Sequence, residues 1–431
     1  MSVSSQQKEQ LGVGICGLGT VGSGAFNLLV NNEAEISRKT NRRINVVQVG
    51  CRRDHPNCDL TGVDVTRDIF DVVKNPAVDI VLELIGGTDV AMQLVVAAIE
   101  NKKHVVTANK ALIALHGEKL FKMAADAGVC LKYEAAIAGG IPIVKAIREG
   151  LAGNDIEFVA GIINGTTNFI LTEMESAGNR DFADVLAEAQ ALGYAEADPT
   201  FDIEGVDAAH KATIMSAIAF GIPVQFDKAY VEGITKLTEQ DIRYAEQLGY
   251  RIKLLGIVKR RPEGVELRVH PSLVPSKRLI ANVEGAMNAV LVQADAVGST
   301  MYYGKGAGAE PTASAVLGDV IDAAINLRKG THAPLGTFTD AKLLPISEIH
   351  CEYMIGLEVA DKPGVLHAVT GVFARNSVSI RAAEQDGIGS DARLVFLTHD
   401  AKEASVQSCL AEFKSLDVVK HVGALLRVVA G

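Results

Sequence analysis

A glycine-rich loop near the start of the chain constrains the fold more than any other feature. An apolar run at residues 11 to 16 leads into Gly17, Gly19 and Gly22, and a helical pattern follows at about residues 25 to 38. Glycine allows the tight turn, the close approach of backbone to a pyrophosphate, and the packing of helix on strand. Strand, loop and helix in this order indicate a βαβ unit that binds a dinucleotide at the positive end of the helix.

The alternation of strand and helix continues beyond the loop, which is typical of a parallel sheet with helices on both faces. Strands are predicted at residues 44 to 50, 78 to 85, 104 to 108 and 129 to 133, and helices at 92 to 100 and 111 to 127. We therefore expect a Rossmann domain over residues 1 to 140. The loop residues expected to contact the cofactor are Gly17, Leu18, Gly19, Thr20, Val21 and Gly22.

The residues after the second predicted strand bear on which dinucleotide is bound. NAD-binding folds usually place an acid there, on the ribose 2′-hydroxyl. This chain has Arg52 and Arg53 instead, and guanidinium groups suit a 2′-phosphate through bidentate, charge-assisted hydrogen bonds. The pattern favours NADP(H), while Asp54 leaves NAD(H) possible; the alternative is a solvated basic turn.

Composition narrows the class of protein. The length of 431 residues predicts more than one domain, and the formal net charge of −10 argues against nucleic acid or an anionic membrane as a partner. No long uncharged apolar run and no signal-peptide pattern occur. The six cysteines are scattered without a CxxC pair, as in reduced thiols. We expect a cytoplasmic enzyme.

The middle of the chain reads as a second, mixed α and β domain over residues 141 to 304. Strands are predicted at residues 155 to 163, 251 to 258, 265 to 270, 288 to 297 and 300 to 303. Asn164 begins a polar cluster that could cap the helix after the first of these strands. A predicted helix at 311 to 327 is expected to return to the Rossmann domain, completing it with residues 305 to 330, and residues 331 to 350 read as a linker.

The last part of the chain, residues 351 to 431, has the predicted order βαββαβ. A strand at 353 to 359 precedes a turn and a helix, two strands follow, and a helix and a last strand close the pattern. This order resembles an ACT domain, which implies a sensor of small molecules. A purely structural dimerisation module is the alternative. The fold class is therefore α/β, with a Rossmann domain, an α+β catalytic and dimerisation domain, and an ACT-like domain.

Asp207 and Lys211 lie four residues apart in an Ala-rich, apolar helical segment, so their side chains share one helix face. Taken alone, the spacing favours a solvated surface ion pair of little energetic value. Beside a dinucleotide-binding domain, a second interpretation arises. One of the two residues would orient a polar substrate while the other moves a proton.

Several long motifs together resemble the homoserine dehydrogenase family over essentially the whole chain, in the monofunctional variant with a C-terminal ACT domain. They are GLGTVGSG (17 to 24), TANKALI (107 to 113), YEAAIAGGIPI (133 to 143), GIINGTTNFIL (161 to 171), LGYAEADPTFDIEGVDAAHK (192 to 211) and GAGAEPTASAVLGD (306 to 319). The resemblance implies NAD(P)-dependent interconversion of L-aspartate 4-semialdehyde and L-homoserine, in threonine, methionine and isoleucine biosynthesis.

The resemblance also assigns roles at the reacting centre. Lys211 matches the family's catalytic lysine and would give or take the proton; acting as a base requires a depressed pKa, for which Lys110 is the expected neighbouring cation. Glu196 and Asp207 match the substrate-binding acids, and Asp202 is a further expected contact.

Further contacts follow from the same resemblance. Thr107 and Lys110 are expected at the nicotinamide side, and Gly193 and Gly308 are expected to approach the cofactor by backbone. The loop after residue 133 matches a monovalent-cation site, and oxygen-only ligands suit Na⁺. Its expected ligands are the carboxylate of Glu134 and the carbonyls of Ile137, Gly139 and Ile141.

The ACT-like segment suggests feedback inhibition by threonine. The expected effector residues are Asp361, Gly364, Val365 and Leu366, at an interface between copies in a homodimer or homotetramer. Two rival functions remain open at this point. An aspartate-semialdehyde dehydrogenase would need an activated cysteine with a nearby histidine. A non-catalytic nucleotide sensor would need no proton-transfer lysine beside substrate-sized acids.

Overall fold

The structure is a computed structural model that describes residues 10–53, 55–176, 180–329, 341–387 and 392–429. The chain forms two compact units. The cofactor unit comprises Met1–Asp155, Thr213–Asp227 and Tyr302–Asp340, and the substrate unit comprises Ile156–Ala212, Lys228–Met301 and Ala341–Gly431. Asp54 and the first half of the predicted linker, residues 331 to 340, lie outside the described residues.

The cofactor unit is built on a six-stranded parallel sheet in the order β3-β2-β1-β4-β5-β6. This is the order of a Rossmann fold, so the expected fold class is confirmed. Strands β1, β4, β5 and β6 are almost wholly buried because helices cover both faces, whereas β3 at the edge of the sheet has no buried residue. They are β1 Gln10–Cys16, β2 Arg43–Gly50, β3 Asp64–Thr66, β4 Ile80–Glu83, β5 His104–Thr107 and β6 Leu131–Lys132.

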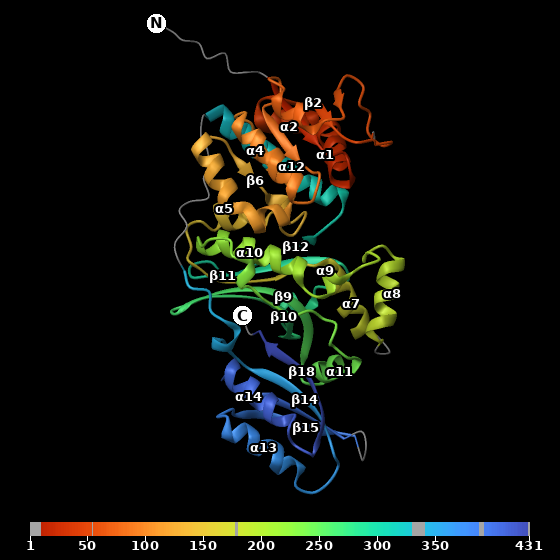
Figure 1. The fold of residues 1–431 in the computed structure, drawn as a ribbon, viewed down its shortest axis with the longest axis vertical. Helices are drawn as coiled ribbons and strands as arrows, with labels where there is room; N and C mark the ends of the chain where they lie inside the picture. The colour runs from red at the N-terminus through yellow and green to blue at the C-terminus, as the bar shows by residue number, and fades with distance from the viewer. Residues whose placement is uncertain (1–9, 54, 177–179, 330–340, 388–391, 430–431) are drawn as a thin grey trace. The chain divides into compact units, whose positions relative to one another are not determined.

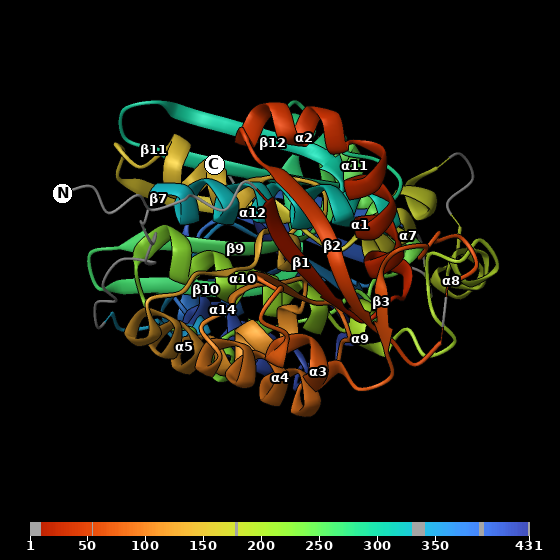
Figure 2. The same cartoon turned by 90° about the horizontal axis from the view of Figure 1, so that it is seen from above.

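Helices lie on both sides of this sheet, as Figure 2 shows. On one side are α1 Thr20–Asn31, α2 Glu33–Thr40 and α12 Ala309–Lys329, and on the other are α3 Ile69–Lys74, α4 Asp89–Glu100 and α5 Lys110–Ala127. The single helix expected at residues 25 to 38 is wrong. Helix α1 starts earlier, at Thr20, and ends before Asn32, whose backbone leaves the helical range (φ −105°, ψ 15°). Asparagine competes for backbone hydrogen bonds and so favours helix ends.

Helix α12 belongs to the cofactor unit although it is far from α1 in the chain. The two helices pack so closely that a Cβ on Gly24 would lie 2.8 Å from the carbonyl oxygen of Ala309. Apolar residues of α12, among them Val316 and Val320, share one buried core with Phe26 of α1. The small residue at position 24 is therefore what allows α12 to cover this face of the sheet.

The substrate unit contains a larger sheet in the order β12-β11-β7-β9-β10-β18-β14-β16-β15, with β8 also paired to β10. Its strands are β7 Ile156–Ile162, β8 Tyr230–Val231, β9 Tyr250–Arg261, β10 Gly264–Pro275, β11 Met287–Ala294, β12 Gly298–Lys305, β14 Tyr353–Val359, β15 Ile380–Asp386, β16 Arg393–Thr398 and β18 Val419–Val428. Its longer helices are α7 Gly165–Glu175, α8 Phe182–Ala191, α11 Glu239–Gln247, α13 Val365–Arg375 and α14 Glu403–Phe413. Helix α10 Val206–Phe220 begins in this unit and continues into the cofactor unit from Thr213, as β12 does from Tyr302. The short helix α9 Thr200–Ile203 also lies in this unit.

The C-terminal part has the expected βαββαβ order, with α13 and α14 beside strands β14, β15 and β18 (Figure 1). The last strand of this module, β18, also pairs with a strand outside the module. Strand β18 pairs with β14 on one side and runs parallel to β10 on the other, with Ser272 opposite Arg427 and Leu273 opposite Val428. The C-terminal sheet is thus continuous with the central sheet of the substrate unit.

Arg427 joins the two halves of this sheet through a buried network. Its guanidinium donates two hydrogen bonds to Glu403, of 2.7 and 2.9 Å, and one of 3.0 Å to Glu232. The phenol of Tyr230 donates to Glu232 over 2.8 Å. The Arg427 side chain is 1% exposed and that of Glu403 is fully buried. Burial alone would raise the pKa of Glu403, but the hydrogen bonds and charge of Arg427 outweigh burial and lower it.

His270 lies on β10 beside this network and is fully buried. Burial, together with the charges of Arg427 and Arg268, lowers the pKa of His270 well below its ordinary value. A histidine that stays neutral in the fold takes up a proton on unfolding below about pH 6.5, so stability falls as the pH drops beneath that value, by up to about 1.4 kcal/mol per pH unit. We expect the urea midpoint of the substrate unit to fall between about pH 7.5 and 5.5, and to fall less in His270→Gln. An equal fall in both proteins would contradict this assignment.

Among the residues that the structure describes, none of the helices is long and apolar enough to span a membrane.

Candidate active site

The glycine loop has the conformation that the sequence pattern requires. Gly17 has φ +97°, and a Cβ there would lie 2.6 Å from the carbonyl oxygen of Leu84. A Cβ on Gly22 would lie 1.9 Å from the carbonyl oxygen of Gly17, so this helix can start at the loop only with glycine at that position. At Gly19 the space is open. The first N–H groups of α1 therefore border an accessible loop where a pyrophosphate can approach the backbone.

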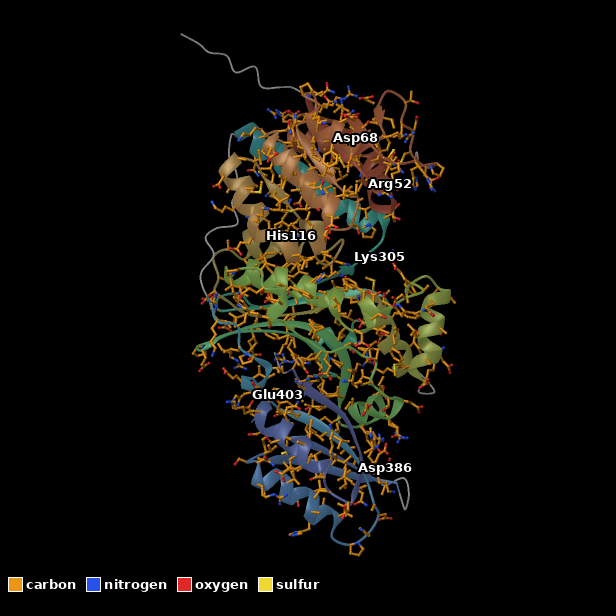
Figure 3. All side chains as sticks on the ribbon, viewed as in Figure 1. Arg52, Asp68, His116, Lys305, Asp386 and Glu403 are labelled. Carbon is orange, nitrogen blue, oxygen red and sulfur yellow. The ribbon has the colours of Figure 1, made fainter. Side chains whose placement is uncertain are left out.

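Arg52 and Arg53 follow β2 and are both exposed; Arg52 is labelled in Figure 3. The structure adds a third guanidinium that the sequence analysis missed. Arg67 follows β3 and donates to the carbonyl oxygen of Cys51 over 3.2 Å. Strands β2 and β3 are neighbours in the parallel sheet, so both segments end at the same edge. The signal that was overlooked is the position of Arg67 directly after a strand.

Thr107 and Lys110 lie where β5 gives way to α5. The Thr107 hydroxyl is buried and donates to a carboxylate oxygen of Glu83 over 2.6 Å. Asn109 caps α5 by accepting from the N–H of Leu112, and its amide donates to the carbonyl oxygen of Gly87. These bonds fix the ends of β4 and β5 relative to each other and place Lys110 as the first residue of α5. Its role as the second cation beside Lys211 stays a prediction.

The carboxylate of Glu134 accepts two backbone hydrogen bonds, and its expected role as a cation ligand stays a prediction. One of its oxygens accepts from the N–H of Val144 (2.8 Å) and the other from the N–H of Lys145 (2.9 Å). Burial, with the charge of Asp319, raises the pKa of Glu134 to about 7. The described residues contain no group of three or more His, Cys, Asp or Glu side chains placed to hold a metal ion. A cation in this loop would therefore depend mainly on main-chain carbonyls.

Gly139 shows how tightly this loop is folded. It has φ +52°, and a Cβ there would lie 2.1 Å from the carbonyl oxygen of Gly306. The next residue, Gly140, donates its N–H to the carbonyl oxygen of Lys305 over 3.0 Å. Gly308, with φ +114°, lies at the start of α12 in the same unit. The loop and the segment before α12 are thus held together backbone to backbone.

The substrate unit brings four of the polar residues named above into one hydrogen-bonded cluster. The Lys211 ammonium donates to Asp207 Oδ2 and to the carbonyl oxygen of Ile163, both over 2.7 Å. The Asn164 amide donates to Asp207 Oδ2 over 2.9 Å and to Asp202 Oδ1 over 2.7 Å. Its oxygen accepts from the N–H of Thr167 and so caps α7. The capping expected of Asn164 is confirmed, and its second role as the link between the two acids was missed.

The Asp207 and Lys211 pair is not a surface ion pair. The side chains are only 3% and 11% exposed, whereas pairs of negligible energetic value are typically solvated. An ammonium and a carboxylate in such surroundings interact strongly and hold each other in place. Of the two side chains, that of Lys211 is the more exposed and is the one that can meet a ligand.

Glu196 and Gly193 lie on the segment that follows α8, and both are exposed. The main-chain oxygen of Glu196 accepts from Gln190 over 3.1 Å. The neighbouring Tyr194 accepts from the Thr166 hydroxyl through its carbonyl oxygen and stacks on Phe169. These contacts tie the segment to α7, the helix that Asn164 caps. They leave the Glu196 carboxylate on the outside of the cluster.

The cysteines lack the properties of a catalytic nucleophile. Cys16, Cys51, Cys130 and Cys409 are buried. Burial raises the pKa of Cys16, and raises the pKa of Cys351 and of Cys409 to about 11 in each case. A thioester mechanism needs the opposite shift. The structure thus disfavours the aspartate-semialdehyde dehydrogenase alternative.

The predicted effector residues form a turn at the start of α13. Gly364 has φ +92° and is the N-cap residue, Val365 is buried, and Leu366 is 50% exposed. Asp361 is also exposed. The turn offers an accessible surface, and its assignment as an effector site stays a prediction.

Three family models match the chain. They are described as "Homoserine dehydrogenase, NAD binding domain" over residues 17–134, "Homoserine dehydrogenase" over residues 142–321, and "ACT domain" over residues 353–418. A homoserine dehydrogenase of Pseudomonas aeruginosa is 53% identical over 429 residues, which cover 96% of this chain and 98% of that protein.

Solved structures agree with these matches. The crystal structure of a homoserine dehydrogenase from Thiobacillus denitrificans superposes with a TM-score of 0.93 at 51% identity, covering 97% of this chain and 98% of that one. A hyperthermophilic archaeal homoserine dehydrogenase in complex with NADPH superposes with a TM-score of 0.62 at 26% identity, covering 74% of this chain and 98% of that one.

Proposed function

The chain belongs to the homoserine dehydrogenase family, and from this premise we propose how its own residues carry out the NAD(P)-dependent reaction. In the proposed assignment, Lys211 is the proton donor and acceptor for the interconversion of L-aspartate 4-semialdehyde and L-homoserine. The observation that carries it is the partly accessible ammonium of Lys211, held by Asp207 and by the Ile163 carbonyl. The test is oxidation of L-homoserine by the purified enzyme, followed at the nicotinamide absorbance.

In the reducing direction the aldehyde carbon would receive a hydride, which NADPH would supply when bound and so become NADP⁺. The carbonyl oxygen gains the electron pair of the broken π bond, and Lys211 transfers a proton from Nζ to that oxygen as charge develops. Lys211 is then neutral beside the Asp207 carboxylate and regains a proton from water. In the reverse direction the neutral amine removes the hydroxyl proton. A non-catalytic sensor would have no use for this arrangement.

Asp207 keeps its expected role as a substrate-binding acid in this proposal, and it also positions Lys211. One oxygen of Asp207 already accepts from both Lys211 and Asn164. Asp202 and Glu196 are then the acids proposed to bind the ammonium group of the substrate. Glu196 is suited to this role because it is exposed. Asp202 is suited to it because Asn164 holds it next to Asp207.

We propose NADP(H) as the preferred cofactor, bound at the 2′-phosphate by Arg52 and Arg53 with Arg67 beside them. The archaeal relative binds NADPH, and three guanidinium groups at one sheet edge suit a phosphate dianion. Bidentate contacts of this kind contribute about 1.5–3 kcal/mol each.

We therefore expect Arg52→Gln with Arg53→Gln to raise the KM for NADPH by about 10²- to 10⁴-fold and to change the KM for NADH much less. The measurement is kcat/KM for both cofactors. Arg38→Gln is the matched control, because Arg38 is an exposed arginine of α2 that pairs with Glu35. Equal losses with NADPH and NADH would show that the two arginines do not read the 2′-phosphate.

Three further elements complete the proposal. A monovalent cation such as Na⁺ would bind the loop from residue 134 to 141 through the carbonyl oxygens of Ile137, Gly139 and Ile141. A homodimer or homotetramer would place the turn at residues 361 to 366 at an interface where threonine inhibits. The location would be cytoplasmic, which six free cysteines support.

A further inference from the structure

A cavity of about 710 Å³ lies inside the substrate unit, between the segment that follows β8 and the C-terminal module. We call it the junction cavity. Residues 230 to 238 form one wall, and parts of α14, β14, β16 and β18 form the other. Its volume lies within the range of about 300–1,000 Å³ that is typical of small-molecule sites. It does not include the turn at residues 361 to 366.

The floor of the junction cavity is a closed polar network. Arg427 and Glu232 line it and are bonded to each other, and Glu403 holds the other side of the guanidinium. Asp241 also lines the cavity and accepts from the N–H and hydroxyl of Thr238. The charged groups of this network are therefore hydrogen-bonded to other protein groups. They shape the cavity rather than supply its ligand contacts.

The remaining charged groups of the junction cavity are of both signs and lie nearer to solvent. Lys236, Lys414 and Glu204 are exposed, while Arg393 is mostly buried and pairs with Glu358 over 2.7 Å. Leu237, Leu410 and Leu426 add apolar surface. The cations suit a ligand carboxylate, the carboxylate of Glu204 suits a ligand ammonium, and the apolar wall suits a small aliphatic side chain.

We propose that the junction cavity binds a free α-amino acid, with its carboxylate near Lys236 and Lys414, its ammonium near Glu204, and its side chain against the leucines. This site lies within one chain and is separate from the turn at residues 361 to 366.

The wall of the junction cavity is in direct contact with the segment that carries the substrate acids. A Cβ on Gly233 would lie 2.2 Å from the carbonyl oxygen of Ile203 and 2.5 Å from the Cα of Glu204. Ile234 donates its N–H to Ile203, and the Thr235 hydroxyl donates to the Glu204 carboxylate over 3.0 Å. Residues 203 to 205 connect Asp202 to the start of α10. A ligand that moves Glu204 or residues 232 to 235 therefore shifts the backbone between Asp202 and Asp207.

The test is calorimetric titration of the full chain with L-threonine, L-valine and L-methionine, and with acetate and methylammonium as probes that carry one charge each. We expect at least one amino acid to bind and the single-charge probes not to bind. Lys236→Glu with Lys414→Glu should raise the Kd of that amino acid by about tenfold or more, because it reverses the charges offered to the carboxylate. Lys119→Glu with Lys122→Glu, which reverses two exposed lysines of α5, is the matched control and should leave the Kd unchanged.

Three results would overturn the proposal: no amino acid binds, acetate binds as well as the amino acids, or the Kd is the same in Lys236→Glu with Lys414→Glu as in the unchanged protein. As a second readout, the bound amino acid should slow or speed amide hydrogen exchange at residues 203 to 211, and unchanged exchange there would refute the coupling. Only the consequence of this coupling for homoserine binding rests on the proposed function. Both binding and exchange are measured without turnover, so a failure of the proposed activity is distinguishable from a failure of the site.

Discussion

Lys211→Arg is expected to retain the fold and lose about 10²- to 10⁴-fold in kcat, the range that a positioned acid or base contributes. Arginine keeps a positive charge that can pair with Asp207, which is buried and needs a cation beside it. A guanidinium does not give up its proton near neutral pH. The variant thus removes proton transfer while preserving the ion pair. The measurements are kcat for homoserine oxidation and the Kd for NADPH, of which only kcat should change.

Two further variants distinguish the loss of proton transfer at Lys211 from a loss of protein stability. Lys211→Ala should be as inactive as Lys211→Arg and also less stable, because Asp207 loses its cation; added methylamine should restore part of its turnover. Lys122→Met is the matched control, since Lys122 is an exposed lysine paired with Asp126, and its kcat should equal that of the unchanged enzyme. If Lys211→Arg kept most of its kcat, another group would have to move the proton.

The local part of this site was predictable from the sequence. The glycine spacing at residues 17 to 22 predicted strand, turn and helix because only glycine satisfies the backbone conformation at Gly17 and the close contacts at Gly17 and Gly22. The spacing of Asp207 and Lys211 predicted a shared helix face, and helix periodicity guarantees it. Asn164 was predicted as a cap because its side chain and the first N–H groups of α7 are neighbours in the chain.

What the sequence could not supply is which distant side chains converge. Periodicity tells which face of a helix is apolar but not what packs on it, so the burial of Asp207 and Lys211 was left open. The bonds from Asn164 to Asp202 and Asp207 span about 40 residues of chain and depend on how α7, α9 and α10 pack. The same holds for Arg67 beside Cys51, which requires knowing that β2 and β3 are neighbours.

The pairing of β18 with β10 is the largest feature that sequence reasoning did not predict. The βαββαβ order of the C-terminal module is complete without it, and such a module alone leaves a free sheet edge. In this chain β10 covers that edge, and Val429 packs into the same core as Leu255 and Ile257 of β9. A deletion from about residue 350 onward would therefore expose the edge of β10. The C-terminal module is part of the structure of the substrate unit as well as a candidate regulator.

Arg427→Met should destabilise the substrate unit by about 3–5 kcal/mol, the usual cost of removing one partner from a buried ion pair. Glu403 would remain fully buried without its bidentate partner, and Glu232 would lose its bond from the same side chain. We expect a lower urea midpoint and faster amide hydrogen exchange along β14 and β18. Arg427→Met combined with Glu403→Met should recover most of the loss, since an apolar pair leaves no charge buried alone. Arg375→Met, which removes an exposed arginine paired with Glu412, is the control and should cost less than about 1 kcal/mol. If Arg427→Met were as stable as this control, backbone pairing and apolar contacts alone would hold β18 to β10. The ion-pair network would then not be what joins the C-terminal module to the central sheet.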